Sequence, residues 1–146
     1  MPEGIEKDLY FVAVKILLRD GNKLLITHDI FKSWDVPGGR IRANEFSTPL
    51  ENVLARKMNE ELGPHIRYAL GKPVVTFRVE RIEHSLNKQV RIFAIGYEAT
   101  YLGGDIILGD HHDKMEWVDI TDFKPEDYFT GGWLVGIQDY LALSKV

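Results

Sequence analysis

The sequence contains no cysteine, which excludes disulfide bonds, thiolate metal sites and a cysteine nucleophile. It also lacks a long apolar run, since no stretch approaches the roughly 20 residues that a membrane-spanning helix needs. The first residues include Glu3, Glu6 and Asp8 and no basic region followed by an apolar segment, so we expect no secretory signal peptide. The expectation is a cytoplasmic protein.

An excess of positive charge is missing as well. Lys and Arg number 18 against 22 Asp and Glu, and the net charge of −4 argues against a nucleic-acid polymer as partner. A small anionic substrate is not excluded, because a metal ion and a few local cations are enough to bind it. With 146 residues, 45% hydrophobic, and no internal repeat or linker, the chain is expected to form a single domain over residues 1–146.

Apolar and β-branched segments alternate with turn signals and predict strands. The segments 10–18 and 23–28 flank Asp20-Gly21-Asn22, which predicts a β-hairpin. Residues 74–83 and 89–100 predict two longer antiparallel strands, and residues 116–118 predict a short one. An amphipathic pattern over 130–145 predicts a last helix. Together these elements indicate an α/β fold in which helices cover a mixed sheet.

Another helix is expected between the first hairpin and the longer strands. Thr48, Pro49 and Glu51 predict its start as N-cap, first-turn proline and capping-box glutamate, and Gly63-Pro64 marks its end.

Acidic residues occupy unexpected positions on this helix. At about 100° per residue, the apolar stripe that should face the core consists of Leu50, Leu54, Met58 and Leu62. Glu61 projects only about 40° from the middle of that stripe on the same geometry, and Glu60 is adjacent. A carboxylate directed toward a core needs a cation or strong donors, and a hard divalent ion would satisfy both glutamates. The alternative is that both lie on a solvated helix face.

A longer pattern surrounds these glutamates. Trp34-Asp35-Val36-Pro37-Gly38-Gly39 precedes a series made of Glu45, Arg56, Glu60, Glu61 and Gly63. This series resembles the signature of the Nudix hydrolase family, and Glu116-Trp117-Val118 also looks like a feature of that family. The resemblance implies a Nudix-like α/β/α sandwich and a Mg²⁺-dependent hydrolase, with Mn²⁺ as the substitute ion.

The sequence departs from the signature at two places. Ten residues separate Glu45 from Arg56 where the signature has seven, an insertion that a loop tolerates at low cost. Lys57 stands where the signature has its first helix glutamate, which in well-studied members binds metal or helps to activate water. A lysine there adds positive charge, so we expect fewer or more weakly bound ions.

The resemblance also implies roles for individual residues. Glu60, Glu61 and the backbone carbonyl of Gly38 would bind the metal, and Glu116, Asp110 or Asp113 would complete its shell. Arg56 would pair with Glu45 and brace the loop that contains Gly38 against the helix. Alternatively, Arg56 would form an i to i+4 pair with Glu60.

With Lys57 unable to act as base, His111 or His112 is the candidate. A histidine from a comparable loop serves as base in the Nudix branch that hydrolyses nucleotide sugars, and histidine titrates near neutral pH. The alternative is that both histidines lie in an exposed loop. Arg40 is a candidate to bind a substrate phosphate, or it is an ordinary surface charge. Trp34 would stack on the nucleobase of a substrate, or it packs internally.

The expected reaction is hydrolysis of a phosphoanhydride or related bond in a nucleoside diphosphate linked to another moiety, such as a nucleotide sugar, or in a nucleoside triphosphate. Many relatives are homodimers, so a second copy is an expected partner. The alternative is that Lys57 marks a family member that binds a nucleotide or a protein without turnover.

Overall fold

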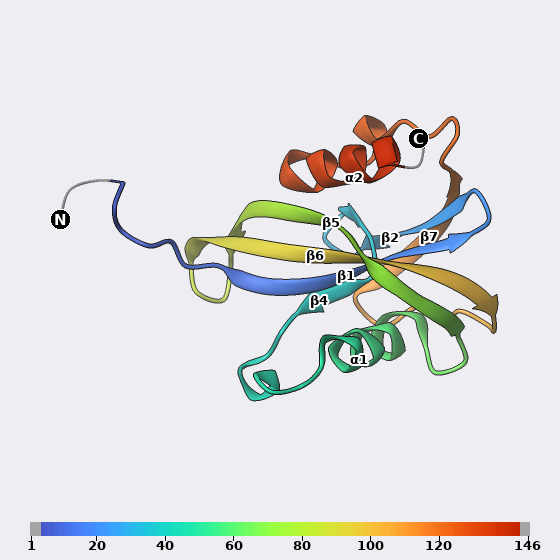
Figure 1. Ribbon diagram of the computed structural model, residues 1–146, viewed down its shortest axis with the longest axis horizontal. Coiled ribbons are helices and arrows are strands. Elements are labelled where there is room, and N and C mark those ends of the chain that lie inside the picture. Colours follow the sequence, from blue (N-terminus) through green and yellow to red (C-terminus); the bar gives the residue numbers. More distant parts are fainter. Residues whose placement is uncertain (1–3, 144–146) are drawn as a thin grey trace.

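The computed structural model describes residues 4–143, and in this part of the chain seven strands form one mixed sheet (Figure 1). The strands run in the order β3-β2-β1-β6-β5, with β4 paired to β1 and β7 paired to β2. β1 and β6 are parallel, and the other pairs are antiparallel. The strands are β1 (Phe11–Asp20), β2 (Lys23–Asp29), β3 (Trp34–Asp35), β4 (Gly38–Arg40), β5 (Arg67–Glu83), β6 (Lys88–Gly103) and β7 (His112–Asp119).

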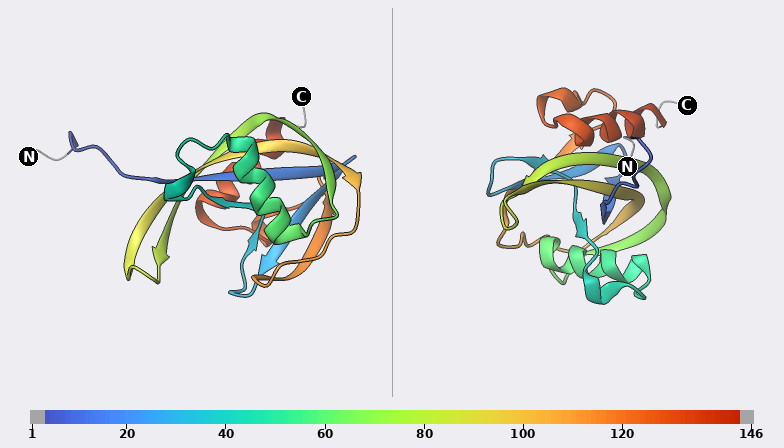
Figure 2. Two further views of the ribbon diagram at one scale, coloured as in Figure 1. Left: turned by 90° about the horizontal axis from the view of Figure 1, so that it is seen from below. Right: turned by 90° about the vertical axis from the view of Figure 1, so that its left-hand side faces the viewer.

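One helix covers each face of the sheet. Helix α1 (Leu50–Leu62) lies on one face and α2 (Gly131–Leu143) on the other, with the strands between them (Figures 1 and 2). Two short 3-10 helices, Ala43–Glu45 and Pro125–Asp127, precede them. This arrangement confirms the predicted α/β/α sandwich. Within the described range, no helix is long and apolar enough to cross a membrane.

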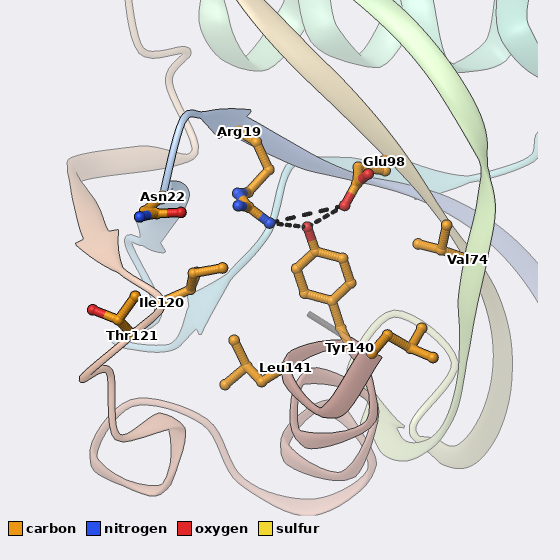
Figure 3. A pocket seen from close by; sticks show the side chains of 9 residues that line it. Arg19, Asn22, Val74, Glu98, Ile120, Thr121, Tyr140 and Leu141 are labelled. Carbon is orange, nitrogen blue, oxygen red and sulfur yellow. Dashed lines mark hydrogen bonds and ion pairs between the residues drawn. The ribbon is translucent and has the colours of Figure 1, made fainter. Parts of the chain in front are cut away.

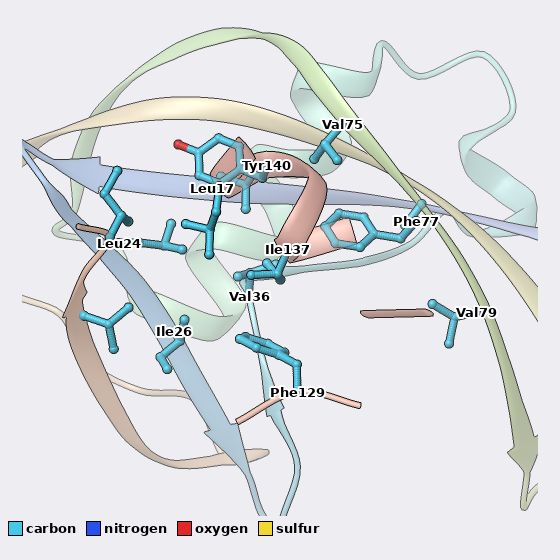
Figure 4. Packing of buried hydrophobic residues seen from close by; sticks show 14 of the residues in the cluster. Leu17, Leu24, Ile26, Val36, Val75, Phe77, Val79, Phe129, Ile137 and Tyr140 are labelled. Atoms are coloured by element: carbon cyan, nitrogen blue, oxygen red, sulfur yellow. The ribbon is translucent and has the colours of Figure 1, made fainter. Parts of the chain in front are cut away.

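Alternate residues of β1 supply two separate cores. Val14, Ile16 and Leu18 pack toward α1 together with Leu54 and Met58 of that helix. The other face of β1 contributes to a cluster under α2 that includes Leu17, Phe77, Phe129, Ile137 and Tyr140 (Figure 4). Because β1 is buried on both faces, its sequence is almost continuously apolar.

The strand predictions were right in kind and too short in extent. The hairpin at Gly21 is confirmed, with Asp20 opposite Lys23. β5 begins at Arg67 rather than at residue 74, because register shifts between Leu70 and Val75 accommodate the proline that breaks the pattern. β7 begins at His112 rather than at residue 116. The last helix was predicted to reach Lys145, which lies outside the described residues.

The predicted N-terminal cap of α1 is wrong. Pro49 is the N-cap residue and no side chain caps the helix. The N–H of Thr48 donates to the carbonyl of Glu45 at 3.0 Å, so Thr48 still belongs to the preceding turn. A capping box forms in that turn instead, where the N–H of Arg42 donates to the Glu45 carboxylate at 2.9 Å.

Candidate active site

Gly38 brings the backbone of β4 against both β1 and α1. Its φ of +141° favours glycine, and a Cβ at this position would overlap the carbonyl oxygen of Val14. The N–H of Gly38 donates to Glu61 Oε2 at 2.8 Å. Gly38 and Gly39, which begin β4 and are called the glycine loop below, are therefore bound directly to a carboxylate of the helix.

Glu61 is the buried carboxylate of this site. Its side chain is 12% exposed, and it lies beside Met58 and Leu62, which are buried as the stripe predicted. Burial raises the pKa of Glu61 above its ordinary value, although the Lys15 charge, the Gly38 N–H and the charges of Lys57 and His112 oppose this. A carboxylate with a raised pKa is a better proton acceptor than an exposed one.

The structure brings His112, and not His111, to Glu61. His112 Nε2 lies 3.4 Å from Glu61 Oε1, and the His112 side chain is 8% exposed. His112 Nδ1 is buried and has no hydrogen-bond partner among the described residues. His111 is exposed, and its backbone carbonyl accepts from the N–H of Ile30 at 3.0 Å.

A β-bulge decides which histidine faces the helix. In the ladder between β2 and β7, His28 is opposite Lys114, and the next residue, Asp29, is opposite His112. Asp113 is therefore an extra residue on β7 with no partner of its own on β2. The extra residue changes the side of the sheet to which the His112 side chain points. His112 consequently faces α1, whereas Lys114 faces the other side of the sheet.

Glu60 is surrounded by cations. Lys57 Nζ lies 3.2 Å from Glu60 Oε2, while Arg56 Nη1 and Arg42 Nη2 lie 3.2 and 3.3 Å from Oε1. Partial burial acts to raise the pKa of Glu60, but hydrogen bonds from Lys57 and Arg56 hold it below its ordinary value. Arg56 also binds Glu45 in a bidentate pair at 2.7 and 2.8 Å, so both interactions expected of Arg56 occur together.

The remaining predicted site residues have other partners. Glu116 is exposed, and its carboxylate accepts from the Tyr128 hydroxyl at 3.2 Å. It shares the sheet face of Lys114, opposite to α1, so the structure does not bring it to Glu61. Arg40 pairs with Glu83 at 2.6 Å.

Trp34 is a packing residue in this structure. Its ring lies edge-on to His28 and Tyr128, with centroid separations of 5.0 and 5.3 Å. The ammonium of Lys114 lies 5.4 Å from the Trp34 ring centroid. His28 in turn pairs with Asp113 at 2.7 Å.

Lys15 is a further residue of this site, and the sequence pattern did not identify it. This lysine is 5% exposed, and its ammonium donates to Asp35 Oδ2 at 2.8 Å and to the Val36 carbonyl at 3.1 Å. It also lies 4.9 Å from the ring centroid of Trp133. The available signal was a single charge inside an apolar strand, which usually requires a buried partner. Lys15 thereby supports the segment that leads into Gly38.

The donors predicted for a metal ion do not converge. Among residues 4–143, no group of three or more acidic or histidine side chains is placed to hold an ion. Cations occupy both oxygens of Glu60, while the Gly38 N–H and His112 face those of Glu61. Mg²⁺ prefers nearly octahedral oxygen coordination, so this arrangement does not fit a divalent ion between the loop and the helix.

The family model described as NUDIX domain matches residues 9–133. The chain belongs to the Nudix family. It is therefore a Nudix-type hydrolase, as the signature at residues 39–63 predicted. No curated protein sequence matches the chain.

Solved structures show the same fold for this Nudix chain. The MutT protein from Methanosarcina mazei Go1 is 21% identical with a TM-score of 0.70, and the alignment covers 94% of each chain. An ADP-ribose pyrophosphatase from Streptococcus suis 89-1591 is 13% identical with a TM-score of 0.65 and the same coverage. A UDP-X diphosphatase is 15% identical with a TM-score of 0.65, covering 99% of this chain and 68% of that one.

A hollow of about 550 Å³ lies near the C-terminal end of α2, where β1 ends (Figure 3). The Tyr140 hydroxyl accepts from Arg19 Nη1 at 2.8 Å and donates to Glu98 Oε2 at 2.5 Å. Burial and the Glu98 carboxylate raise the pKa of Tyr140 to about 12, against the effect of Arg19. These polar groups satisfy one another, which indicates a structural role.

Proposed function

We propose that this chain hydrolyses a phosphoanhydride bond in a nucleoside diphosphate linked to another moiety, either a sugar or a further phosphate. Its place in the Nudix family supports hydrolysis. The observation that carries the proposal is the His112–Glu61 pair beside the glycine loop, where His112 Nδ1 has no hydrogen-bond partner within residues 4–143.

In the proposed reaction, His112 is the base. The Glu61 carboxylate faces Nε2 and favours the tautomer with the proton on that nitrogen, which leaves Nδ1 as the acceptor. Nδ1 is buried in the free protein, so the proposed step requires that substrate binding opens it to the attacking water. The water oxygen then forms the new bond to phosphorus, and the bond to the leaving phosphate oxygen breaks. Such a base typically contributes about 10²- to 10⁴-fold to the rate.

Cationic side chains at the same place suit a diphosphate. Lys57 and Arg42 flank Glu60, and their side chains are 22% and 57% exposed, so both are accessible to an anion. Catalysis of phosphoryl transfer depends mostly on positioning and charge stabilisation, which fixed cations supply. The proposed steps assign nothing to Mg²⁺, because its donors do not converge here.

Two structural neighbours support the substrate class. One is an ADP-ribose pyrophosphatase and one is a UDP-X diphosphatase, and both names describe a nucleoside diphosphate joined to another group.

A substrate-panel assay tests the proposal. Nucleoside triphosphates, dinucleotides, ADP-ribose and nucleotide sugars are incubated with the protein, with Mg²⁺ or with chelator, while phosphate release and products are followed together. We expect turnover of one class, lost in Glu61→Gln. Absence of turnover across the panel, in folded protein that still binds nucleotide, would replace the hydrolase with a binding module.

A further inference from the structure

The Lys57 side chain fills the gap between α1 and the glycine loop. A Cβ at Gly39 would overlap Lys57 Cε and lie 3.0 Å from Nζ, so the lysine stem rests directly on the glycine backbone. Its ammonium lies 3.2 Å from Glu60 Oε2, and the side chain is 22% exposed. Packing on one side and an ion pair on the other hold this charge in place.

The Lys57 charge acts on both predicted metal ligands. Its ammonium is ion-paired with Glu60 at 3.2 Å, and its positive charge also acts on the Glu61 carboxylate. Arg56 and Arg42 supply further positive charge to Glu60, and Lys15 supplies it to Glu61. The charge that a bound cation would provide is therefore already present on the chain itself.

We propose that the Lys57 ammonium is the resident cation of this site and that the free protein holds no divalent ion between Gly38 and the two glutamates. The inference rests on the proposed function for the identity of the site, but its test measures metal binding rather than turnover.

Charge repulsion and the loss of existing contacts both disfavour binding of a divalent ion beside Lys57. A divalent ion beside Glu60 would be close to a like charge in a partly buried position, where solvent screens weakly. It would also have to displace Lys57 from Glu60 and the Gly38 N–H from Glu61 to obtain oxygen ligands. Lys57→Glu would replace this repulsion by attraction and would add an oxygen ligand for the ion.

Binding of Mn²⁺ alone to the full chain tests the proposal, with free Mn²⁺ followed by electron paramagnetic resonance. The variants are Lys57→Glu, which adds a carboxylate, and Lys57→Gln, which only removes the charge. Lys124→Glu is the control, because Lys124 is exposed and precedes the 3-10 helix at 125–127, on the α2 side of the sheet. It changes the net charge as Lys57→Glu does.

We expect no saturable binding to wild type or Lys124→Glu below about 1 mM Mn²⁺, and one site in Lys57→Glu that is at least roughly tenfold tighter. Lys57→Gln should also tighten binding, by a smaller factor, and it decides the matter if Lys57→Glu does not fold by circular dichroism.

One Mn²⁺ bound by wild type at micromolar concentration would overturn the inference, and so would unchanged affinity in the folded Lys57 variants. Neither result decides whether the chain hydrolyses a substrate, which the substrate-panel assay measures separately. Conversely, an inactive protein that binds Mn²⁺ only after Lys57→Glu would refute the proposed function and leave this inference standing.

Discussion

The backbone N–H of Gly109 donates to the carbonyl oxygen of Glu61 at 3.0 Å, so the residue that supplies the buried carboxylate also anchors the segment leading to His112. The N–H of Ile107 donates to the carbonyl of Leu62 at 2.9 Å in the same way. Carbonyls in the last turn of a helix lack partners within the helix, and here the loop satisfies two of them. The position of His112 against Glu61 therefore depends on close contact between the loop and α1.

Gly109→Ala should separate these two elements. A Cβ at Gly109 would overlap the carbonyl oxygen of Glu60, which is backbone and cannot move aside without disturbing the helix end. We expect a loss of about 1–3 kcal/mol in the free energy of unfolding, typical of an overpacked contact, and at least a roughly tenfold fall in kcat as His112 moves away. Urea unfolding and steady-state kinetics measure the two effects.

Gly21→Asn is the matched control for that change. Gly21 has a positive φ, which Gly109 does not, but a Cβ there meets nothing within 4 Å, and asparagine tolerates this conformation. Its kcat should match wild type. An unchanged kcat in Gly109→Ala would show that the contact does not position the base.

The two adjacent histidines should differ sharply in their effect on turnover. His112→Gln removes the group that faces Glu61, and we expect kcat to fall by about 10²- to 10⁴-fold. His111→Ala removes an exposed side chain, and kcat should stay within about twofold of wild type. Full turnover in both variants would refute histidine as the base.

Much of α1 was predictable because helical periodicity fixes the direction of each side chain. The apolar stripe correctly placed Met58 and Leu62 in the core and Glu61 at its edge. The choice between His111 and His112 was not predictable, since it depends on the bulge at Asp113. A bulge reverses the facing of a side chain without leaving a signal in the local sequence.

Partners distant in sequence explain what else escaped the sequence analysis. The charge of Lys15 inside an apolar strand indicates a buried partner, but only the fold shows that this partner is Asp35. Glu116 belongs to a Glu-Trp-Val strand as predicted, but strand alternation directs it away from α1 and toward Tyr128. Spacing along the chain identifies candidate residues, whereas the sheet determines which of them meet.

The free energy of unfolding of Glu61→Gln, relative to wild type, should rise as the pH is raised. Because burial raises the pKa of Glu61 above 4.5, this group favours the fold below about pH 4.5, and the contribution is lost as the pH rises through the folded-state pKa. Glutamine does not titrate, so the stability of the variant relative to wild type should increase from about pH 4.5 to neutral pH. Urea unfolding at several pH values measures this difference, and a difference that stays constant with pH would contradict it.

Tyr140 offers a test at alkaline pH. Its pKa of about 12 lies above the value near 10 of an unfolded tyrosine, so its contribution to stability is present below about pH 10 and is lost as the pH rises toward 12. In ultraviolet titration of tyrosinate, Tyr140→Phe should remove the component near pH 12, whereas the exposed-residue control Tyr10→Phe should keep it. Glu98→Gln should shift that component downward, because the Glu98 carboxylate is one cause of the raised pKa. Persistence of the component in Tyr140→Phe would mean that another tyrosine is the buried one that titrates last.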